Sequence, residues 1–149
     1  MKRKKSLGKS GGEWLIGLLV IIIDQIIKYL LKGVNFPVIN GFLSINYATN
    51  SGAGFSILSG YNMLLVFLTS AIIALLIYII LKKSLSSVQR LMLIFIASAA
   101  TSNLIDRVTK GFVVDYIDFS FFPVFNFADF VITVCTIILV ISLVRDKKL

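Results

Sequence analysis

Charged side chains interrupt the apolar C-terminal half of the chain. Four of them lie within or between two apolar runs: Asp106, Arg107, Asp115 and Asp129. An ionised group in such a setting costs free energy unless it is neutralised or used. Two carboxylates held together at low dielectric share one proton, so one activates water as a base while the other protonates a carbonyl as an acid. Asp115 and Asp129 have no obvious cation of their own, so together they suit aspartic-peptidase chemistry. Taken singly, Asp115 is equally interpreted as an interfacial loop residue and Asp129 as a carboxylate of an ion pathway.

Other polar residues have spacings that suit supporting roles. Asp24 and Lys28 are four residues apart and can neutralise each other on one helical face, either as a structural ion pair or as part of the site. Asn103, Asp106 and Arg107 share a helical face, and Arg107 can hold Asp106 or a nearby backbone carbonyl. Asn126 precedes Asp129 by three residues, and we expect it in the same helical register.

The composition excludes several kinds of chemistry. The 149 residues contain no histidine and one cysteine, Cys135, so a His/Cys zinc site, a disulfide within the chain and Ser-His-Asp catalysis are all excluded. Cys135 is interpreted as a small apolar packing residue. We expect no metal and no cofactor. The net charge of +8 reports membrane orientation, and nucleic-acid binding is the weaker interpretation.

The hydropathy pattern predicts the elements that carry these residues. With 58% hydrophobic residues and a mean hydropathy of +0.96, the chain reads as a single integral membrane domain over 1–149. The predicted spans are about 14–31, 61–81, 91–105 and 124–144. Residues 1–13 form a basic tail, and the basic clusters place both termini in the cytoplasm. Segments 32–60 and 106–123 then lie outside, and the acidic residues gather near the outer leaflet.

Two further patterns bear on packing. The segment from Asn35 to Tyr47 alternates loosely around Pro37, which favours a short hairpin on the outer membrane surface. Residues 50–56 are a turn rich in small residues that allows close backbone approach, although alone this is weak evidence for a site. Small residues over 97–102 give the third predicted span a face suited to close helix packing.

Five separated motifs together resemble one enzyme family. These are DQIIK (24–28), NSGAGFS (50–56), NLIDR (103–107), VVDYI (113–117) and FNFAD (125–129), and their order resembles that of the lipoprotein signal peptidases, or signal peptidase II. The resemblance covers essentially the whole chain. The chain departs from the family pattern at three places: it has Ser102 where the family usually has glycine, Thr49 where the family usually has a basic residue, and GAGF where the family has GAAF. None of these departures touches the two aspartates expected to act.

The resemblance implies an aspartic endopeptidase of the bacterial inner membrane that cuts prolipoprotein signal peptides before the diacylglyceryl-modified cysteine. The implied fold is a four-helix membrane bundle with a small extracytoplasmic β-cradle and a short periplasmic helix. The expected partners are prolipoprotein substrates, membrane lipid and the inhibitor globomycin, and we expect a monomer. The family's catalytic aspartates fall on Asp115 and Asp129, and its other functional positions fall on Asp24, Lys28, Asn50, Gly52, Asn103, Asp106, Arg107 and Asn126.

Three alternatives fit less well. A proton- or ion-coupled carrier would use the carboxylates as a relay, but the sequence predicts no acidic residue in the inner half of the bundle. A noncatalytic lipoprotein-binding protein would not need both Asp115 and Asp129. A Ser/Lys signal peptidase could use Ser56 or Ser102 with Lys28, but it would need a large soluble domain.

Overall fold

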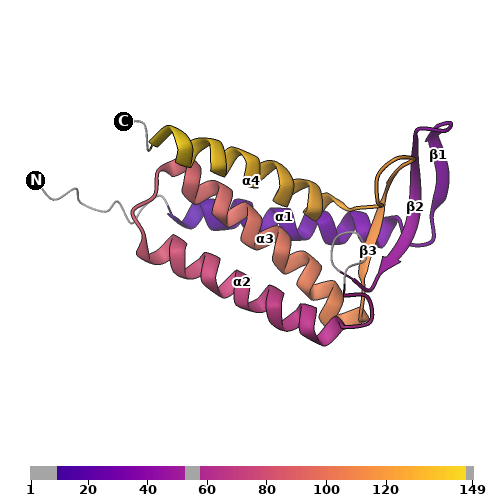
Figure 1. The fold of residues 1–149 in the computed structure, drawn as a ribbon, viewed down its shortest axis with the longest axis horizontal. Helices are drawn as coiled ribbons and strands as arrows, with labels where there is room; N and C mark the ends of the chain where they lie inside the picture. Colours follow the sequence, from indigo (N-terminus) through magenta and orange to yellow (C-terminus); the bar gives the residue numbers. More distant parts are fainter. Residues whose placement is uncertain (1–9, 53–57, 147–149) are drawn as a thin grey trace, which may run out of the picture.

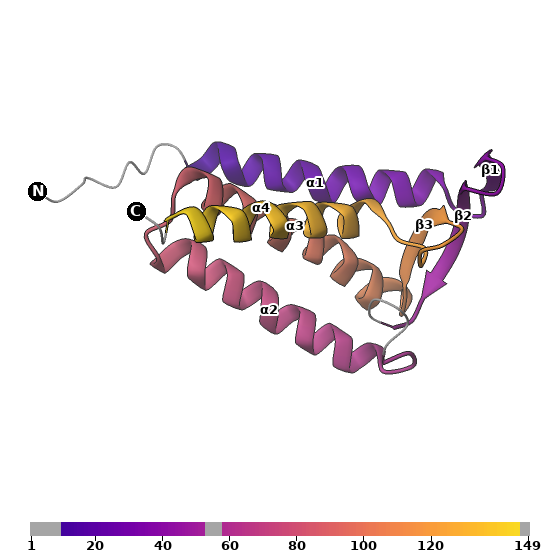
Figure 2. The same ribbon diagram turned by 45° about the horizontal axis from the view of Figure 1, so that its top comes forward.

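The computed structural model describes residues 10–52 and 58–146. Helices form one long bundle, and a small sheet stands across one end of it (Figure 1, Figure 2). The elements follow the order α1 (Ser10–Leu30), β1 (Asn35–Ile39), β2 (Leu43–Asn50), α2 (Asn62–Lys82), α3 (Ser87–Lys110), β3 (Val113–Phe119) and α4 (Phe127–Asp146).

Helix α3 is the centre of the bundle, since it packs against each of the other three helices. Its small residues Ala97, Ala99 and Ser102 are buried, as the predicted packing face required. Gly17 of α1 meets this face at close range, because a Cβ atom there would lie 2.6 Å from the Ser98 Oγ. The close approach of α1 to α3 therefore depends on a residue without a side chain.

Three helices, α2, α3 and α4, are long and apolar enough to cross a membrane by length and composition. Helix α1 has the same 21-residue length as α2, but it carries Glu13, Asp24 and Lys28 among its apolar residues. In the described part of the chain, the structure thus supports a membrane protein with three clear candidate spans, and the fourth span stays a prediction.

The helix ends differ from the limits of the apolar runs. Helix α3 extends beyond 91–105 in both directions, from a capping box between Ser86 and Gln89 to a left-handed Gly111 with φ 84°. Helix α4 begins at Phe127, because Phe125 pairs with Ile117 of β3 instead of joining the helix. The expectation that Asn126 lies inside the helix is therefore wrong.

The sheet is antiparallel throughout, in the order β1-β2-β3. Strands β1 and β2 form the predicted hairpin, and β2 pairs with β3, which follows directly after α3. The register between β2 and β3 shifts between Ile45 and Ala48, which brings Ala48 opposite Asp115. The described residues between the helices form strands and turns. The expected short periplasmic helix stays a prediction, because residues 53–57 lie outside the described residues.

Candidate active site

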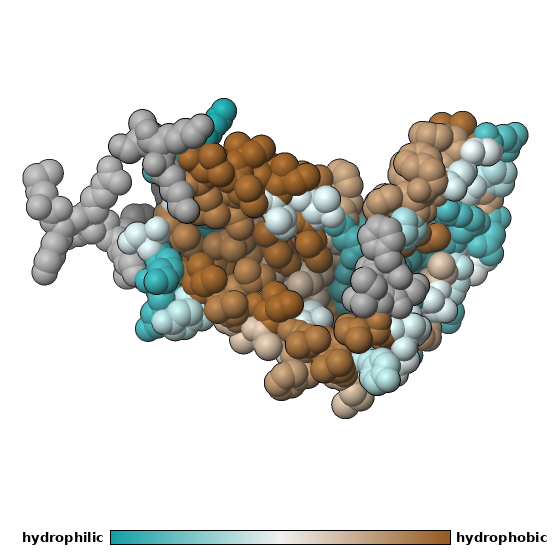
Figure 3. Space-filling model, viewed as in Figure 1, coloured by the Kyte–Doolittle hydropathy of each residue, from teal (hydrophilic) through white to brown (hydrophobic). Residues whose placement is uncertain are grey.

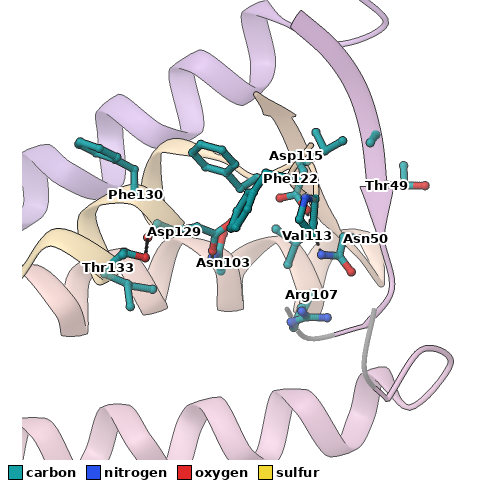
Figure 4. A pocket seen from close by; sticks show the side chains of 15 residues that line it. Thr49, Asn50, Asn103, Arg107, Val113, Asp115, Phe122, Asp129, Phe130 and Thr133 are labelled. Carbon is teal, nitrogen blue, oxygen red and sulfur yellow. Dashed lines mark hydrogen bonds between the residues drawn. The ribbon is translucent and has the colours of Figure 1, made fainter. Parts of the chain in front are cut away.

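A cavity of about 640 Å³ lies where the sheet meets α3 and α4. Ten positions were singled out from the sequence, and five of them line this cavity (Figure 4): Asn50, Asn103, Arg107, Asp115 and Asp129. They come from β2, α3, β3 and α4, so residues far apart in the sequence meet in one place. The remaining walls are largely apolar and include Phe122, Phe125 and Phe130.

Asp115 is almost fully buried, with 2% of its surface exposed. Its two carboxylate oxygens accept hydrogen bonds from different side chains, Oδ1 from Asn126 at 2.7 Å and Oδ2 from Asn50 at 2.9 Å. Burial, reinforced by the nearby charge of Asp129, raises the pKa of Asp115 to about 6, although the two amide hydrogen bonds oppose the shift. The pKa of this carboxyl is thus close to neutral pH.

Asp129 lies in the first turn of α4, and its position follows from how that helix begins. Asn126 precedes the helix and accepts a bond from the Asp129 N–H at 2.9 Å, while the Asp129 Oδ2 accepts one from the Asn126 N–H at 3.2 Å. This reciprocal pair has the arrangement of a capping box. The Asp129 Oδ1 accepts a third bond, at 2.8 Å, from the Asn103 amide.

Two asparagines connect the two carboxylates. Asn126 is fully buried, and it binds Asp115 through its side chain and Asp129 through its backbone. Its side-chain nitrogen also lies 3.1 Å from the Asn103 Oδ1, and Asn103 in turn donates to Asp129. Both carboxylates are therefore held by amide donors, and both line the same cavity.

Behind the cavity, Lys28 forms the centre of a buried ionic network. Its side chain is fully buried, and the ammonium group lies 2.8 Å from Asp24 and 3.0 Å from Asp106. It also donates to the Asn103 Oδ1 at 2.8 Å. The three protons of the ammonium group match these three acceptors. The predicted pair of Asp24 and Lys28 is confirmed, and it contacts the cavity indirectly, through Asn103.

Asp24 also anchors the N-terminus of α4. Its Oδ1 accepts a hydrogen bond from the Ala128 N–H at 3.0 Å, and its Oδ2 accepts one from the Ser102 hydroxyl at 2.6 Å. The Phe127 N–H donates to the Tyr116 hydroxyl at 3.0 Å. Burial raises the pKa of Tyr116, so the phenol stays neutral.

Asn126 accepts two further bonds at this helix end, one from the Asp129 N–H through its side chain and one from the Phe130 N–H through its carbonyl. Every N–H of the first turn of α4 therefore has a partner. Since Asp129 belongs to this turn, the same bonds hold its carboxylate in place.

Asp106 anchors the start of β3, as Asp24 anchors the start of α4. Its Oδ2 accepts a hydrogen bond from the Val114 N–H at 3.1 Å, one residue before Asp115. Its Oδ1 accepts from Lys110 at 2.7 Å and from Gln25 at 3.1 Å. The carboxylate is fully buried and is surrounded by donors, so it fixes the start of the strand that carries Asp115.

Arg107 takes the second of its two predicted roles. Its Nη2 donates to the carbonyl of Gly52 at 2.5 Å, and within the described residues no carboxylate forms an ion pair with it. The alternative that Arg107 holds Asp106 is wrong, because Lys28 and Lys110 already occupy that carboxylate. The Gly52 N–H donates to the Asn50 Oδ1, so Gly52 joins two residues of the cavity wall.

Sequence reasoning missed three residues of this network: Gln25, Ser102 and Tyr116. Gln25 donates to the Ser102 Oγ at 2.9 Å and to Asp106. Ser102 was noted as a departure from the family glycine, as a possible nucleophile and as part of the small-residue packing face, but not as a partner of Asp24. Its hydroxyl is buried against Asp24. The usable signal was that Gln25 and Ser102 are polar residues inside apolar runs. No group of three or more His, Cys, Asp or Glu side chains in the described segments could hold a metal ion.

Replacing Lys28 by methionine should strongly destabilise the fold, because it leaves Asp24 and Asp106 buried with their shared cation removed. We expect a loss of about 3–5 kcal/mol in unfolding free energy, as for other broken buried ion pairs. Resistance to unfolding by SDS in mixed micelles measures it. Lys110→Met is the matched control, since Lys110 binds the same Asp106 but its side chain is 36% exposed. It should cost about 1 kcal/mol or less. Equal losses in both variants would contradict the central role of Lys28.

The chain is similar to known proteins over most of its length. The sequence pattern of the family described as Signal peptidase (SPase) II matches residues 16–145. The lipoprotein signal peptidase of Caldanaerobacter subterraneus subsp. tengcongensis is 40% identical over 126 residues, covering 80% of this chain and 87% of the relative. That of Halothermothrix orenii is 34% identical over 140 residues, covering 91% and 97%.

The fold has relatives among solved structures as well. A bacterial membrane enzyme determined at 2.3 Å by the in meso method superposes with a TM-score of 0.86 at 34% identity, covering 93% of this chain and 91% of the other. A second solved structure described as a bacterial membrane enzyme, determined at 1.9 Å, superposes with a TM-score of 0.82. Sequence and fold agree, and the chain belongs to the signal peptidase II family.

Proposed function

We propose that this protein is a membrane aspartic endopeptidase that removes signal peptides from prolipoproteins. Family membership and the names of the relatives support the substrate class. The observation that carries the reaction type is the pair of carboxylates of the buried Asp115 and the half-buried Asp129, which line one cavity and are joined through Asn126. These two residues are the proposed catalytic groups.

In the proposed reaction, the two carboxylates hold one proton between them, with a water molecule and the peptide carbonyl in the cavity. The ionised carboxylate takes a proton from the water as it attacks, and the protonated one donates to the carbonyl oxygen. A pKa of about 6 for Asp115 supports this, because the group can hold or release a proton near neutral pH. The two carboxyl groups titrate as a pair, so the resting proton belongs to both.

The supporting residues act by holding this geometry. Asn126 and Asn50 donate amide hydrogen bonds to the two oxygens of Asp115, and Asn103 donates one to Asp129, which fixes the orientation of both carboxylates. Lys28 keeps Asn103 oriented by binding its oxygen, which leaves the Asn103 amide protons for Asp129. We propose that these are positioning residues, together with Asp24, Asp106, Arg107 and Gly52.

The proposed substrate is a prolipoprotein carrying a diacylglyceryl-modified cysteine, cut just before that residue. The cavity suits a lipid-linked peptide, since Phe130, Ile132 and Thr133 of α4 form part of its wall and Phe130 is 53% exposed. The acyl chains can remain in the bilayer beside α4 while the peptide occupies the polar end. A cyclic peptide such as globomycin would compete for the same cavity.

The proposed membrane arrangement has four spans, with α1 as the fourth. The lipid-facing side of α1 supports this, because Leu15, Ile22 and Ile26 are exposed while Asp24 and Lys28 are buried against α3 and α4. The Lys and Arg distribution supports cytoplasmic termini and a site near the outer leaflet of the bacterial inner membrane. The proposed oligomeric state is a monomer.

The alternatives are less favourable. A carrier would need acidic or basic side chains along a path across the bundle, yet none lies between Trp14 and Ile23 of α1 or between Phe130 and Val144 of α4. Ser102 is unsuited to be a nucleophile, because its buried hydroxyl donates to Asp24. Ser56 lies outside the described residues.

Replacing either aspartate by asparagine should abolish cleavage. Asp115→Asn and Asp129→Asn remove the acid–base pair, so we expect kcat to fall by roughly 10³-fold or more. The measurement is a gel-shift assay on a purified diacylglyceryl-modified prolipoprotein in detergent.

Asp118→Asn is the matched control for this assay. Asp118 lies on the same strand but binds Asn46 and does not line the cavity, so this variant should stay active. Persistent cleavage by either Asp115→Asn or Asp129→Asn would remove that residue from catalysis. An inactive wild type would refute the proposed function.

The pH dependence of cleavage should respond to Asn50. Its amide donates to the charged form of Asp115 and so lowers the pKa of that carboxyl. Asn50→Ala should therefore raise this pKa, and the alkaline limb of the kcat/KM profile, which reports loss of the shared proton, should shift upward by about one unit. Asn46→Ala, a like change on the same strand that affects Asp118 instead, should leave the limb in place. A limb that is unmoved or shifted downward in Asn50→Ala would contradict the assignment.

A further inference from the structure

The sheet has two chemically different faces, and the register shows which is which. Asp115, Ile117 and Phe119 alternate along β3, so they point to the same side, toward the cavity. Across the sheet, Ile117 pairs with Ile45 and Ile45 with Phe36, while Phe119 pairs with Leu43 and Leu43 with Ile39. The opposite face carries Pro37, Ser44 and Asp118, which pair with one another in the same way.

The cavity-side face continues past the cavity as an exposed apolar surface. We call it the outer apolar face, and it consists of the exposed Phe36, Ile39, Phe42 and Phe121 together with the half-buried Leu43 and Phe119. Phe121 is 74% exposed, and Phe36, Ile39 and Phe42 are each about half exposed at 48%, 52% and 45%. The rings are packed together, with centroids 5.5 Å apart for Phe42 and Phe119 and 5.8 Å apart for Phe42 and Phe121. Such an exposed aromatic cluster marks an interaction site.

The position of this face selects the membrane as its partner. Figure 3 shows the sheet as an arm beyond the end of the apolar bundle, with hydrophobic surface on the side toward the bundle and hydrophilic surface on the far side. Exposed tyrosines at the nearby helix ends, Tyr29 of α1 and Tyr61 before α2, are 79% and 64% exposed. Tyrosine is enriched at the membrane–water interface, so these residues mark that level. The outer apolar face lies beyond the level of these tyrosines and carries no charged residue.

The outer apolar face is also continuous with the cavity. Phe119 stacks on Phe125 with centroids 6.1 Å apart, and Phe125 packs against Phe122 at 5.8 Å. Both Phe122 and Phe125 line the cavity. An unbroken row of aromatic rings therefore leads from the exposed face to the candidate active site.

We propose that the outer apolar face inserts into the headgroup and acyl boundary of the outer leaflet, and so seals the cavity mouth against the bilayer. The activity test of this proposal rests on the proposed function, whereas the insertion test does not. A lipid-linked substrate can then pass from the bilayer into the cavity along the aromatic row without its acyl chains entering water. The partner is lipid, and neither a second copy of the chain nor the soluble part of a substrate.

Fluorescence quenching tests the insertion directly. The single native tryptophan is replaced in Trp14→Phe, and Phe121→Trp places a probe on the outer apolar face. In nanodiscs, phosphatidylcholine brominated near the top of its acyl chains should quench this probe strongly, while aqueous iodide should not. Ser44→Trp on the opposite face is the matched control and should respond to iodide alone. Quenching of residue 121 by iodide only would overturn the proposal, and protection from both quenchers would overturn it in favour of a protein partner.

Activity measurements test the consequence. The double variant Phe36→Ser/Phe121→Ser should lose roughly tenfold or more in kcat/KM for a prolipoprotein in the same bilayer. In detergent, where no leaflet has to be engaged, it should stay within about twofold of wild type. Phe121→Trp keeps an interfacial aromatic and should stay active in both media. Equal losses in bilayer and detergent would indicate a folding defect and overturn the inference. An inactive wild type would refute the proposed function, and the fluorescence result would still decide whether the face inserts.

Discussion

The buried ammonium group of Lys28 is the interaction on which the rest of this structure depends. A charge with no exposure to solvent costs several kcal/mol unless its partners are close and well oriented. Here two carboxylates and one amide oxygen lie within 3.0 Å of it. Each of these partners is itself satisfied by further donors, so the cluster is a complete polar network inside an apolar bundle. Its members come from α1 and α3.

The network positions both candidate catalytic carboxylates by holding the backbone of the elements that carry them. Through Asp24 it holds the N-terminus of α4, the helix that carries Asp129, and through Asp106 it holds the start of β3, the strand that carries Asp115. Asp24 binds Lys28 through Oδ2 and the Ala128 N–H through Oδ1, whereas Asp106 uses its Oδ2 for both Lys28 and the Val114 N–H. Since the two carboxylates sit on different elements, a shared anchor is what keeps their separation constant. The apolar exterior of the bundle leaves this polar end as the place where peptide chemistry can occur.

The sequence predicted the interactions that are local and missed those that tertiary packing decides. The pair of Asp24 and Lys28 follows from helical spacing, and the confirmed hairpin follows from alternation and turn residues. The start of α4 was predicted too early, because helical spacing cannot show that Phe125 pairs with β3. The second partner of Asp24, Ser102, lies 78 positions away in the sequence. Such contacts depend on how helices pack, which spacing does not encode.

The central claim is that Asp115 and Asp129 act as one unit, and a double-mutant cycle tests it most directly. The cleavage rates of Asp115→Asn, Asp129→Asn and the double variant are compared with wild type under single-turnover conditions. If the two carboxylates share one proton in the reaction, each single substitution removes the whole acid–base function, and the double variant is no slower than either single one. Losses that multiply in the double variant would show two independent contributions and would contradict the account.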